Sequence, residues 1–248
     1  MNTHFVFTQL WKRLNFGLLL FFIWNCQSEP TPDQILQKSI QAHGGETWKN
    51  ASSISYLKHT TLLDKNGFVE KKVLQKITHQ WNPFQTKIEW ENQGTKQLAI
   101  LNQSGVRLYH NDELQSDSSL IEKTKKNLNA AFYVFWQPFK LQENAVHFEY
   151  IGQEKLLDSI LTHKLKVYYP NAKNDDLWYF YFDVSSFRLL ATEVNHDQRV
   201  SLITNESVES QTGLFLNKTR NSYFLDSLGS IQYLRATYKY DIIEFIRD

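Results

Sequence analysis

Cysteine, glycine and proline are scarce in this 248-residue chain, and each scarcity excludes a class of protein. One cysteine cannot form a disulfide framework or a cysteine-rich metal cluster, and 9 glycines with 5 prolines exclude collagen-like, mucin-like and linker-rich chains. The 27 Lys and Arg residues are balanced by 26 Asp and Glu residues, so the chain lacks the basic excess that binds nucleic-acid phosphates, and we predict no nucleic-acid partner. Aromatic residues are abundant instead: at 15% they are too frequent for a disordered chain and indicate a folded globule.

The N-terminal segment has the pattern of an export signal. Residues 1–25 contain no acidic side chain, and Lys12 and Arg13 precede an apolar run over residues 14–24. This run of about 11 residues is shorter than the roughly 20 residues that cross a bilayer as a helix. A basic segment followed by a short apolar run is typical of a secretory signal peptide, so we predict that residues 1–25 are removed.

The apolar run ends at the single cysteine, Cys26. The ending Ile23-Trp24-Asn25-Cys26 resembles the lipobox of bacterial lipoproteins, in which the cysteine becomes the first mature residue and carries acyl chains such as palmitate. This resemblance implies a membrane anchor at Cys26 and a lipidated tether over residues 26–32. Gln27 follows the cysteine in place of the Asp that retains some lipoproteins in the inner membrane, which favours the outer membrane. The alternative is an ordinary buried cysteine at the end of a core segment.

Residues 33–248 are predicted to form a single, mainly β domain of the α+β class. Thr31 can cap a first helix, which the glycines at 44 and 45 end. From residue 52 onward, apolar and polar residues alternate in strand after strand, and turns such as Asn66-Gly67 separate them. Short turns favour an antiparallel meander, because parallel pairs need long crossovers. We expect about ten to twelve strands and at least two helices.

A longer helix, predicted over residues 118–137, interrupts the meander. Apolar residues recur at helical spacing up to the aromatic end at 132–136, and Pro138 ends the pattern. The later strand 177–182 is apolar or aromatic on both faces, so it needs cover on both faces. We expect the helix to cover one of them.

Residues that could carry chemistry show no spacing typical of a site. His43 lies at the end of the first helix, where a structural role is the simpler interpretation, and Asp175-Asp176 lacks the spacing of a calcium loop. The other histidines have no partner at metal-ligand spacing, and no nucleophile elbow or phosphate-binding glycine loop occurs. We therefore predict no catalytic residue, no metal site and no cofactor. An envelope hydrolase with a dispersed site is the least favoured alternative.

Three features together resemble the outer-membrane lipoprotein-sorting (LolA/LolB-like) superfamily of Gram-negative envelopes. The first is the helix end Ala42-His43-Gly44-Gly45 followed by Trp48, and the second is the aromatic strand 178–183 that turns into Arg188-Leu189-Leu190. The third is the order of meander, helix and meander.

The resemblance implies a half-barrel, in which helices cover the concave side of a curved antiparallel sheet. In characterised relatives an apolar cavity between sheet and helices takes acyl chains. The candidate cavity residues in this sequence are aromatic: Phe132, Phe135, Trp136, Trp178, Phe180 and Phe182. Ordinary core packing of these residues is the alternative.

The expected function is non-catalytic binding of a hydrophobic ligand, a lipid or an acyl chain, by a lipid-anchored protein of the cell envelope. The alternative is a scaffold lipoprotein that docks a protein partner and has no ligand cavity. The sequence does not identify that partner.

Overall fold

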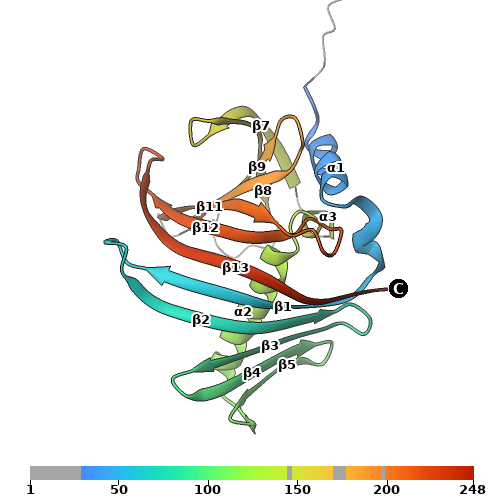
Figure 1. Cartoon of the computed structure of the whole chain (residues 1–248), viewed down its shortest axis with the longest axis vertical. Coiled ribbons are helices and arrows are strands. Elements are labelled where there is room, and N and C mark those ends of the chain that lie inside the picture. Colours follow the sequence, from blue (N-terminus) through green and yellow to red (C-terminus); the bar gives the residue numbers. More distant parts are fainter. Residues whose placement is uncertain (1–28, 144–146, 170–176, 197–198) are drawn as a thin grey trace, which may run out of the picture. The chain divides into compact units, whose positions relative to one another are not determined.

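The computed structural model describes residues 29–143, 147–169, 177–196 and 199–248 (Figure 1). The predicted signal peptide, Cys26 and the Asp175-Asp176 pair lie outside the described residues. Residues 31–248 form one compact unit.

Within the described residues, the chain forms three α-helices, one short 3-10 helix and thirteen strands. The helices are α1 (Pro32–Ala42), η1 (Gly45–Asn50), α2 (Ser118–Phe135) and α3 (Lys140–Glu143). The strands of the first half are β1 (Ala51–Leu63), β2 (Val69–Gln80), β3 (Gln85–Asn92), β4 (Thr95–Asn102), β5 (Gly105–His110) and β6 (Glu113–Leu114). Those of the second half are β7 (His147–Leu156), β8 (Ile160–Tyr168), β9 (Leu177–Asp183), β10 (Leu189–His196), β11 (Arg199–Val208), β12 (Asn217–Leu225) and β13 (Ile231–Arg247).

All of these strands belong to one antiparallel, unclosed sheet. Its order is β6-β5-β4-β3-β2-β1-β13-β12-β11-β10-β9-β8-β7, so β6 and β7 are the edges. Within β1–β6 and within β7–β13, strands next to each other in sequence pair as a meander, as predicted, and the count of thirteen exceeds the expected ten to twelve. The two-residue β6 is too short to leave a periodic pattern in the sequence.

The first and last strands of the chain, β1 and β13, pair with each other at the centre of the sheet. Their register runs from Ala51 opposite Arg247 to Leu62 opposite Ala236. This pairing joins the two meanders into a single sheet.

Local sequence explains where the first helix begins and where the hairpin between β1 and β2 turns. The Thr31 hydroxyl accepts a hydrogen bond from the Gln34 N–H (3.2 Å) and the Gln34 side chain accepts one from the Thr31 N–H (3.0 Å), which makes a capping box for α1. Between β1 and β2, the Asp64 carboxylate accepts from the N–H groups of Asn66 and Phe68, and Gly67 adopts φ +84°.

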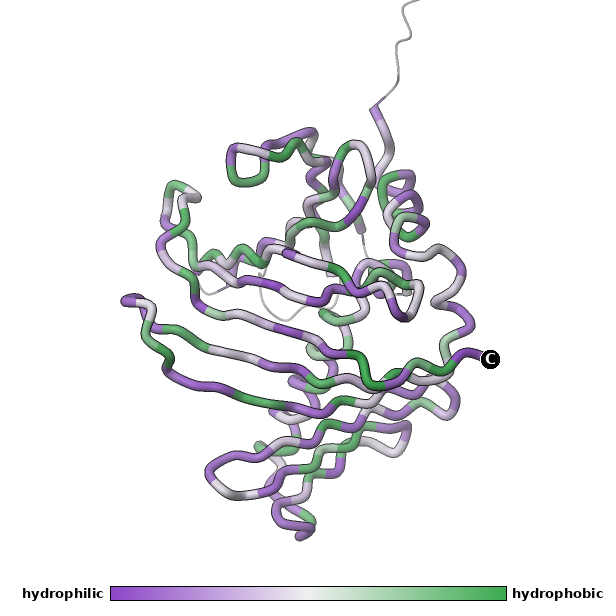
Figure 2. Tube along the Cα trace, in the orientation of Figure 1, coloured by the Kyte–Doolittle hydropathy of each residue, from purple (hydrophilic) through white to green (hydrophobic). Residues whose placement is uncertain are grey.

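Hydrophilic and hydrophobic residues alternate along many of the strands (Figure 2), which gives the sheet two different faces. We call the face that carries Tyr56, Ile77 and Phe180 the inner face. Helix α2 packs on it and passes behind β1 and β2 in Figure 1. One hydrophobic core cluster contains residues of this face together with residues of α1 and α2.

The opposite, outer face carries a second, smaller apolar cluster. It consists of Leu156, Tyr181, Ala191 and Leu202. Strand β9 is therefore covered on both faces, with Phe180 and Phe182 inside and Tyr181 outside, as its sequence predicts. No helix in the described ranges is long and apolar enough to cross a bilayer.

Candidate functional site

An aromatic cluster lies between α2 and the inner face. Phe135 stacks on Tyr56 of β1 with ring centroids 3.9 Å apart, and Trp136 lies 4.7 Å from Trp81. Phe132 lies 4.4 Å from the ring of His79 on β2. The three α2 residues share one side because residues three and four apart lie on the same face of a helix. This group of six residues is called the aromatic cluster below.

The histidine and tyrosine of this cluster are hydrogen-bonded and uncharged at neutral pH, whereas the indole N–H groups of Trp81 and Trp136 are buried without a partner. Hydrogen bonds join His79 Nε2 to the Tyr56 hydroxyl (3.1 Å) and His79 Nδ1 to the Thr86 hydroxyl (3.0 Å). Burial, together with the nearby charge of Lys140, lowers the pKa of His79 to about 3, while burial raises the pKa of Tyr56 well above its usual range. The cluster therefore presents an apolar surface, and its histidine is held between two hydroxyl groups.

The aromatic residues of β9 continue the same interior. Trp178 stacks with Phe180 at 6.5 Å and meets Tyr169 edge-on at 6.1 Å. The Tyr169 hydroxyl is hydrogen-bonded to the Tyr133 hydroxyl of α2. The structure thus brings all six candidate cavity residues into contact with one core cluster, with Trp178 partly exposed and the other five buried: Phe132, Phe135, Trp136, Phe180 and Phe182.

A row of polar side chains crosses the middle of the inner face next to the aromatic cluster. Arg220 of β12 is paired across the strands with Asn205 of β11 and with Tyr238 of β13, and Lys58 of β1 is paired with Tyr240 of β13. We call these five residues the polar belt. The sequence pattern does not reveal this belt, because Arg220 has the polar neighbours Thr219 and Asn221 and no alternation of apolar and polar residues marks the inner face there.

The polar belt holds two cations close enough to influence each other. Arg220 is only 2% exposed, and its Nε atom is buried without a hydrogen-bond partner. The ammonium group of Lys58 lies 5.4 Å from the centroid of the Tyr238 ring. Burial, and then the charge of Arg220, lower the pKa of Lys58 to about 8. Burial raises the pKa of Tyr240, and the Arg220 charge opposes part of that rise.

Other cations of this sheet form ion pairs with carboxylates, unlike Arg220 and Lys58. On β13, Arg235 pairs with Glu70, and Lys239 pairs with Asp241 at 2.9 Å. Among the described residues, no carboxylate lies within ion-pair distance of Arg220 or Lys58.

His43 has a structural role that its position at the helix end only partly predicted. It caps α1, and its buried ring also joins two distant backbone segments. Nδ1–H donates to the Phe215 carbonyl (3.2 Å), and Nε2 accepts from the Leu189 N–H (3.1 Å). Burial lowers the pKa of His43 to about 4, so the ring stays neutral and keeps both bonds at pH 7.

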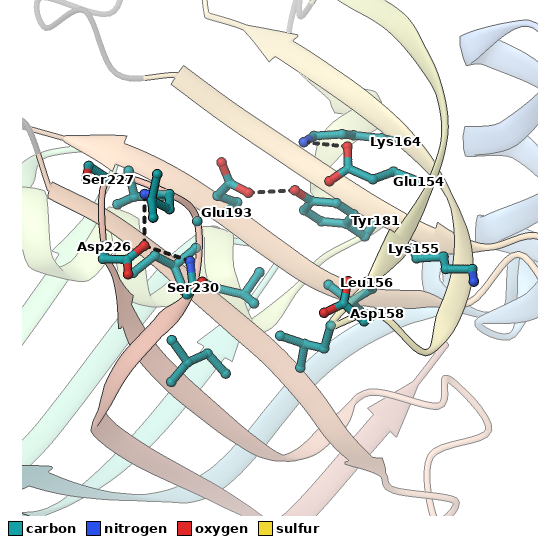
Figure 3. Close-up of a pocket in the computed structure, with 17 residues that line it drawn as sticks. Glu154, Lys155, Leu156, Asp158, Lys164, Tyr181, Glu193, Asp226, Ser227 and Ser230 are labelled. Carbon is teal, nitrogen blue, oxygen red and sulfur yellow. Dashed lines mark hydrogen bonds and ion pairs between the residues drawn. The ribbon is translucent and has the colours of Figure 1, made fainter.

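The outer face has a pocket of about 860 Å³ between the tips of two hairpins (Figure 3). Two pairs of polar groups interact within it: Lys164 contacts Glu154 at 2.9 Å, and the Tyr181 hydroxyl donates to Glu193 at 2.5 Å. Burial, followed by this bond to Glu193, raises the pKa of Tyr181 beyond its usual range. Two of its acidic side chains, Glu154 and Glu193, are thus already engaged by groups of the pocket itself.

Metal-ligating side chains do not gather anywhere in the described ranges: no group of three or more His, Cys, Asp or Glu residues there could hold a metal ion. The residues described thus offer an apolar, aromatic interior with a cationic belt as the main chemical features of the inner face.

No protein-family model matches the chain, and no curated protein matches it in sequence. Among solved structures, the chain is similar to a LolA superfamily protein from Nitrosomonas europaea, with a TM-score of 0.54 and 11% identity over 88% of this chain and 94% of that one. It is also similar to a DUF1329 family protein from Desulfovibrio piger, with a TM-score of 0.51 and 12% identity over 87% of this chain and 92% of that one. The chain therefore has the LolA-like fold that its sequence features resemble.

Proposed function

We propose that this protein is a lipid-anchored carrier of the cell envelope, attached through Cys26, that holds a hydrophobic ligand between the inner face and α2. The observation that carries the proposal is the aromatic cluster, which lines the contact between a helix and an open sheet with rings rather than with charged groups. Binding would involve sequestration only, with no covalent chemistry.

Burial of the ligand supplies the free energy of binding in this proposal. Each methylene group of an acyl chain transferred from water to an apolar interior contributes about 0.8 kcal/mol. Helix α2 acts as a lid, because a chain that enters must part Phe132 and Phe135 from the inner face. The neutral state of His79 and Tyr56 keeps that interior favourable for an apolar chain.

The anchor and the cellular location are part of the same proposal. The apolar run before Cys26 and the lipobox-like ending support an acylated cysteine, and Gln27 supports the outer membrane. A scaffold role would depend on exposed apolar side chains such as Leu228 and Leu157 at the hairpin tips, for which no occupant is indicated. The interior is therefore the better-supported site.

The tryptophans make the proposal testable, because each one after residue 31 lies in or against the inner core cluster. They are Trp48, Trp81, Trp90, Trp136 and Trp178. In the full chain, Trp11→Phe and Trp24→Phe remove the remaining two, and Cys26→Ser removes the acylation site. Fluorescence excited at tryptophan then reports on the interior alone.

Dibromostearate, whose bromine atoms quench tryptophan on contact, is the probe. We expect saturable quenching, and unbrominated stearate should reverse it by competition. Stearate alone is the matched control and should quench nothing. Emission that stays constant over the soluble range of the probe would refute the proposed function.

A further inference from the structure

The two cations of the polar belt contact tyrosines but no carboxylate among the described residues, and they lie in the interior that the proposed ligand would enter. A buried charge without an opposite charge is unfavourable, so proteins pair such groups or use them to bind a ligand. Arg235 and Lys239, elsewhere in this sheet, each form an ion pair with a carboxylate. Arg220 and Lys58 are therefore two cations for which the described residues supply no counter-charge.

The two side chains are suited to an anion that has several oxygen atoms. The guanidinium of Arg220 is a planar fork of donors that matches a carboxylate or a phosphate, and the Lys58 ammonium adds a second positive charge. Tyr240, which lies opposite Lys58 and beside Arg220, brings a hydroxyl whose raised pKa keeps it protonated and able to donate.

The surroundings of the belt fit the rest of an amphiphile. Tyr56 lies two residues before Lys58 on β1 and on the same face, and it is paired with Ile77 on β2. An acyl chain that starts at the belt would thus run directly along the aromatic cluster under α2. Charge at one end and aromatic rings along the rest form the pattern of a site for a charged lipid.

We propose that Arg220 and Lys58 form a headgroup site, which binds the carboxylate or phosphate of an anionic lipid while its acyl chain packs against the aromatic cluster. This inference rests on the proposed function and specifies the chemical class of its ligand. It excludes neutral acyl compounds as the preferred ligand.

The test compares headgroups on one acyl chain, with the tryptophan-quenching assay described above. The probes are dibromostearate, dibromostearyl phosphate and the neutral dibromostearyl alcohol. We expect at least one anionic probe to bind the full chain roughly 10- to 100-fold more tightly than the alcohol, as expected for hydrogen bonds to charged groups. The tighter of the two anions identifies the headgroup.

Variants then assign the selectivity to the belt. Arg220→Gln and Lys58→Gln should each weaken binding of the preferred anion by about tenfold and leave the alcohol unaffected. Lys76→Gln is the matched control: Lys76 is exposed on the outer face of β2, opposite Leu57, so binding should not change. If Arg220→Gln does not fold, two measurements still test the headgroup site. They are the headgroup preference of the unchanged chain and the loss of anion binding in Lys58→Gln.

The outcomes separate the two proposals. Equal binding of the alcohol and both anions would overturn the headgroup site and leave the carrier function standing. Displacement of dibromostearate by inorganic phosphate alone would assign the belt to a free anion and also overturn the inference. Absence of quenching by every probe would overturn the carrier function as well.

Discussion

His43 and His79 are two histidines that the fold holds in the neutral form for different reasons. His43 links the end of α1 to the backbone at Leu189 and Phe215, whereas His79 lies inside the aromatic cluster. Burial lowers the pKa of each ring, to about 4 for His43 and about 3 for His79, from 6.5 in an unfolded chain. Both rings therefore stabilise the fold only while they are uncharged.

Acid should destabilise this protein through these rings. Above pH 6.5 the histidines are neutral in both states, whereas between pH 6.5 and about 4 the unfolded chain binds protons that the folded chain cannot. Each ring should then remove about 1 kcal/mol of stability per pH unit as the pH falls. Urea unfolding between pH 7.5 and 4.5 measures this slope.

A variant isolates the contribution of one ring from that of the carboxylates. His43→Gln should be less stable at pH 7.5 but should lose less stability on acidification than the unchanged chain. His147→Gln, at an exposed position on β7, serves as the control and should keep the original slope. Parallel slopes for His43→Gln and the unchanged chain would contradict the assignment.

The end of α1 docks on the loop between β11 and β12. Gly44 adopts φ +108°, and a Cβ atom at this position would lie 2.4 Å from the Gly213 carbonyl oxygen. Within that loop, the buried Glu209 carboxylate accepts hydrogen bonds from the N–H groups of Gln211 and Thr212, so the loop is held rigidly against the helix end. The contact joins the first helix to the second half of the sheet.

Gly44→Ala should therefore destabilise the fold by roughly 3 kcal/mol, because it adds both backbone strain and a collision with backbone atoms that cannot move freely. The matched control is Gly67→Ala, at φ +84° with no atom near the added methyl group. The control should lower the free energy of unfolding by only about 1 kcal/mol, which comes from backbone strain alone. Thermal or urea unfolding compares the two, and equal losses would show that the docking contact is loose.

Periodicity predicted the elements well where one face of each is buried. The helix expected over residues 118–137 is α2, whose buried residues Thr124, Leu128, Phe132 and Phe135 recur at helical spacing. The hairpin at Asn66-Gly67 and the two covered faces of β9 also follow from local sequence. Patterns of this kind depend on neighbours in the chain, which a single sequence displays.

Features that depend on distant parts of the chain could not be predicted in this way. The pairing of β1 with β13 has no local signal, because the partners are separated by nearly the whole domain. The docking of His43 on Phe215 is hidden for the same reason. The belt cation Arg220 resembles an exposed strand residue in sequence, since only the sheet shows that its side chain lies inside.

At the level of the whole molecule, the core runs without a break across both meanders. The inner cluster extends from Ile35 of α1 to Phe182 of β9, and the central pairing of β1 with β13 spans most of both strands. No boundary in the sheet separates a part that could unfold while the rest stays intact.

We therefore expect a single cooperative unfolding transition for residues 31–248 of the full chain. Tryptophan fluorescence, which reports on the interior, and far-ultraviolet circular dichroism, which reports on the sheet, should give the same urea midpoint. Tyr240→Ala, which removes a buried ring from β13, should lower both midpoints together. Separate midpoints for the two signals would show that the meanders unfold independently.

The central position of β13 also determines when the sheet can be completed during synthesis. The ribosome releases the chain from its N-terminus, so residues 51–63 emerge long before residues 231–247, their partners on one side. Until the last strand is made, β1 has a free edge and the two meanders are not joined. The complete sheet can therefore form only after residues 231–247 have been made.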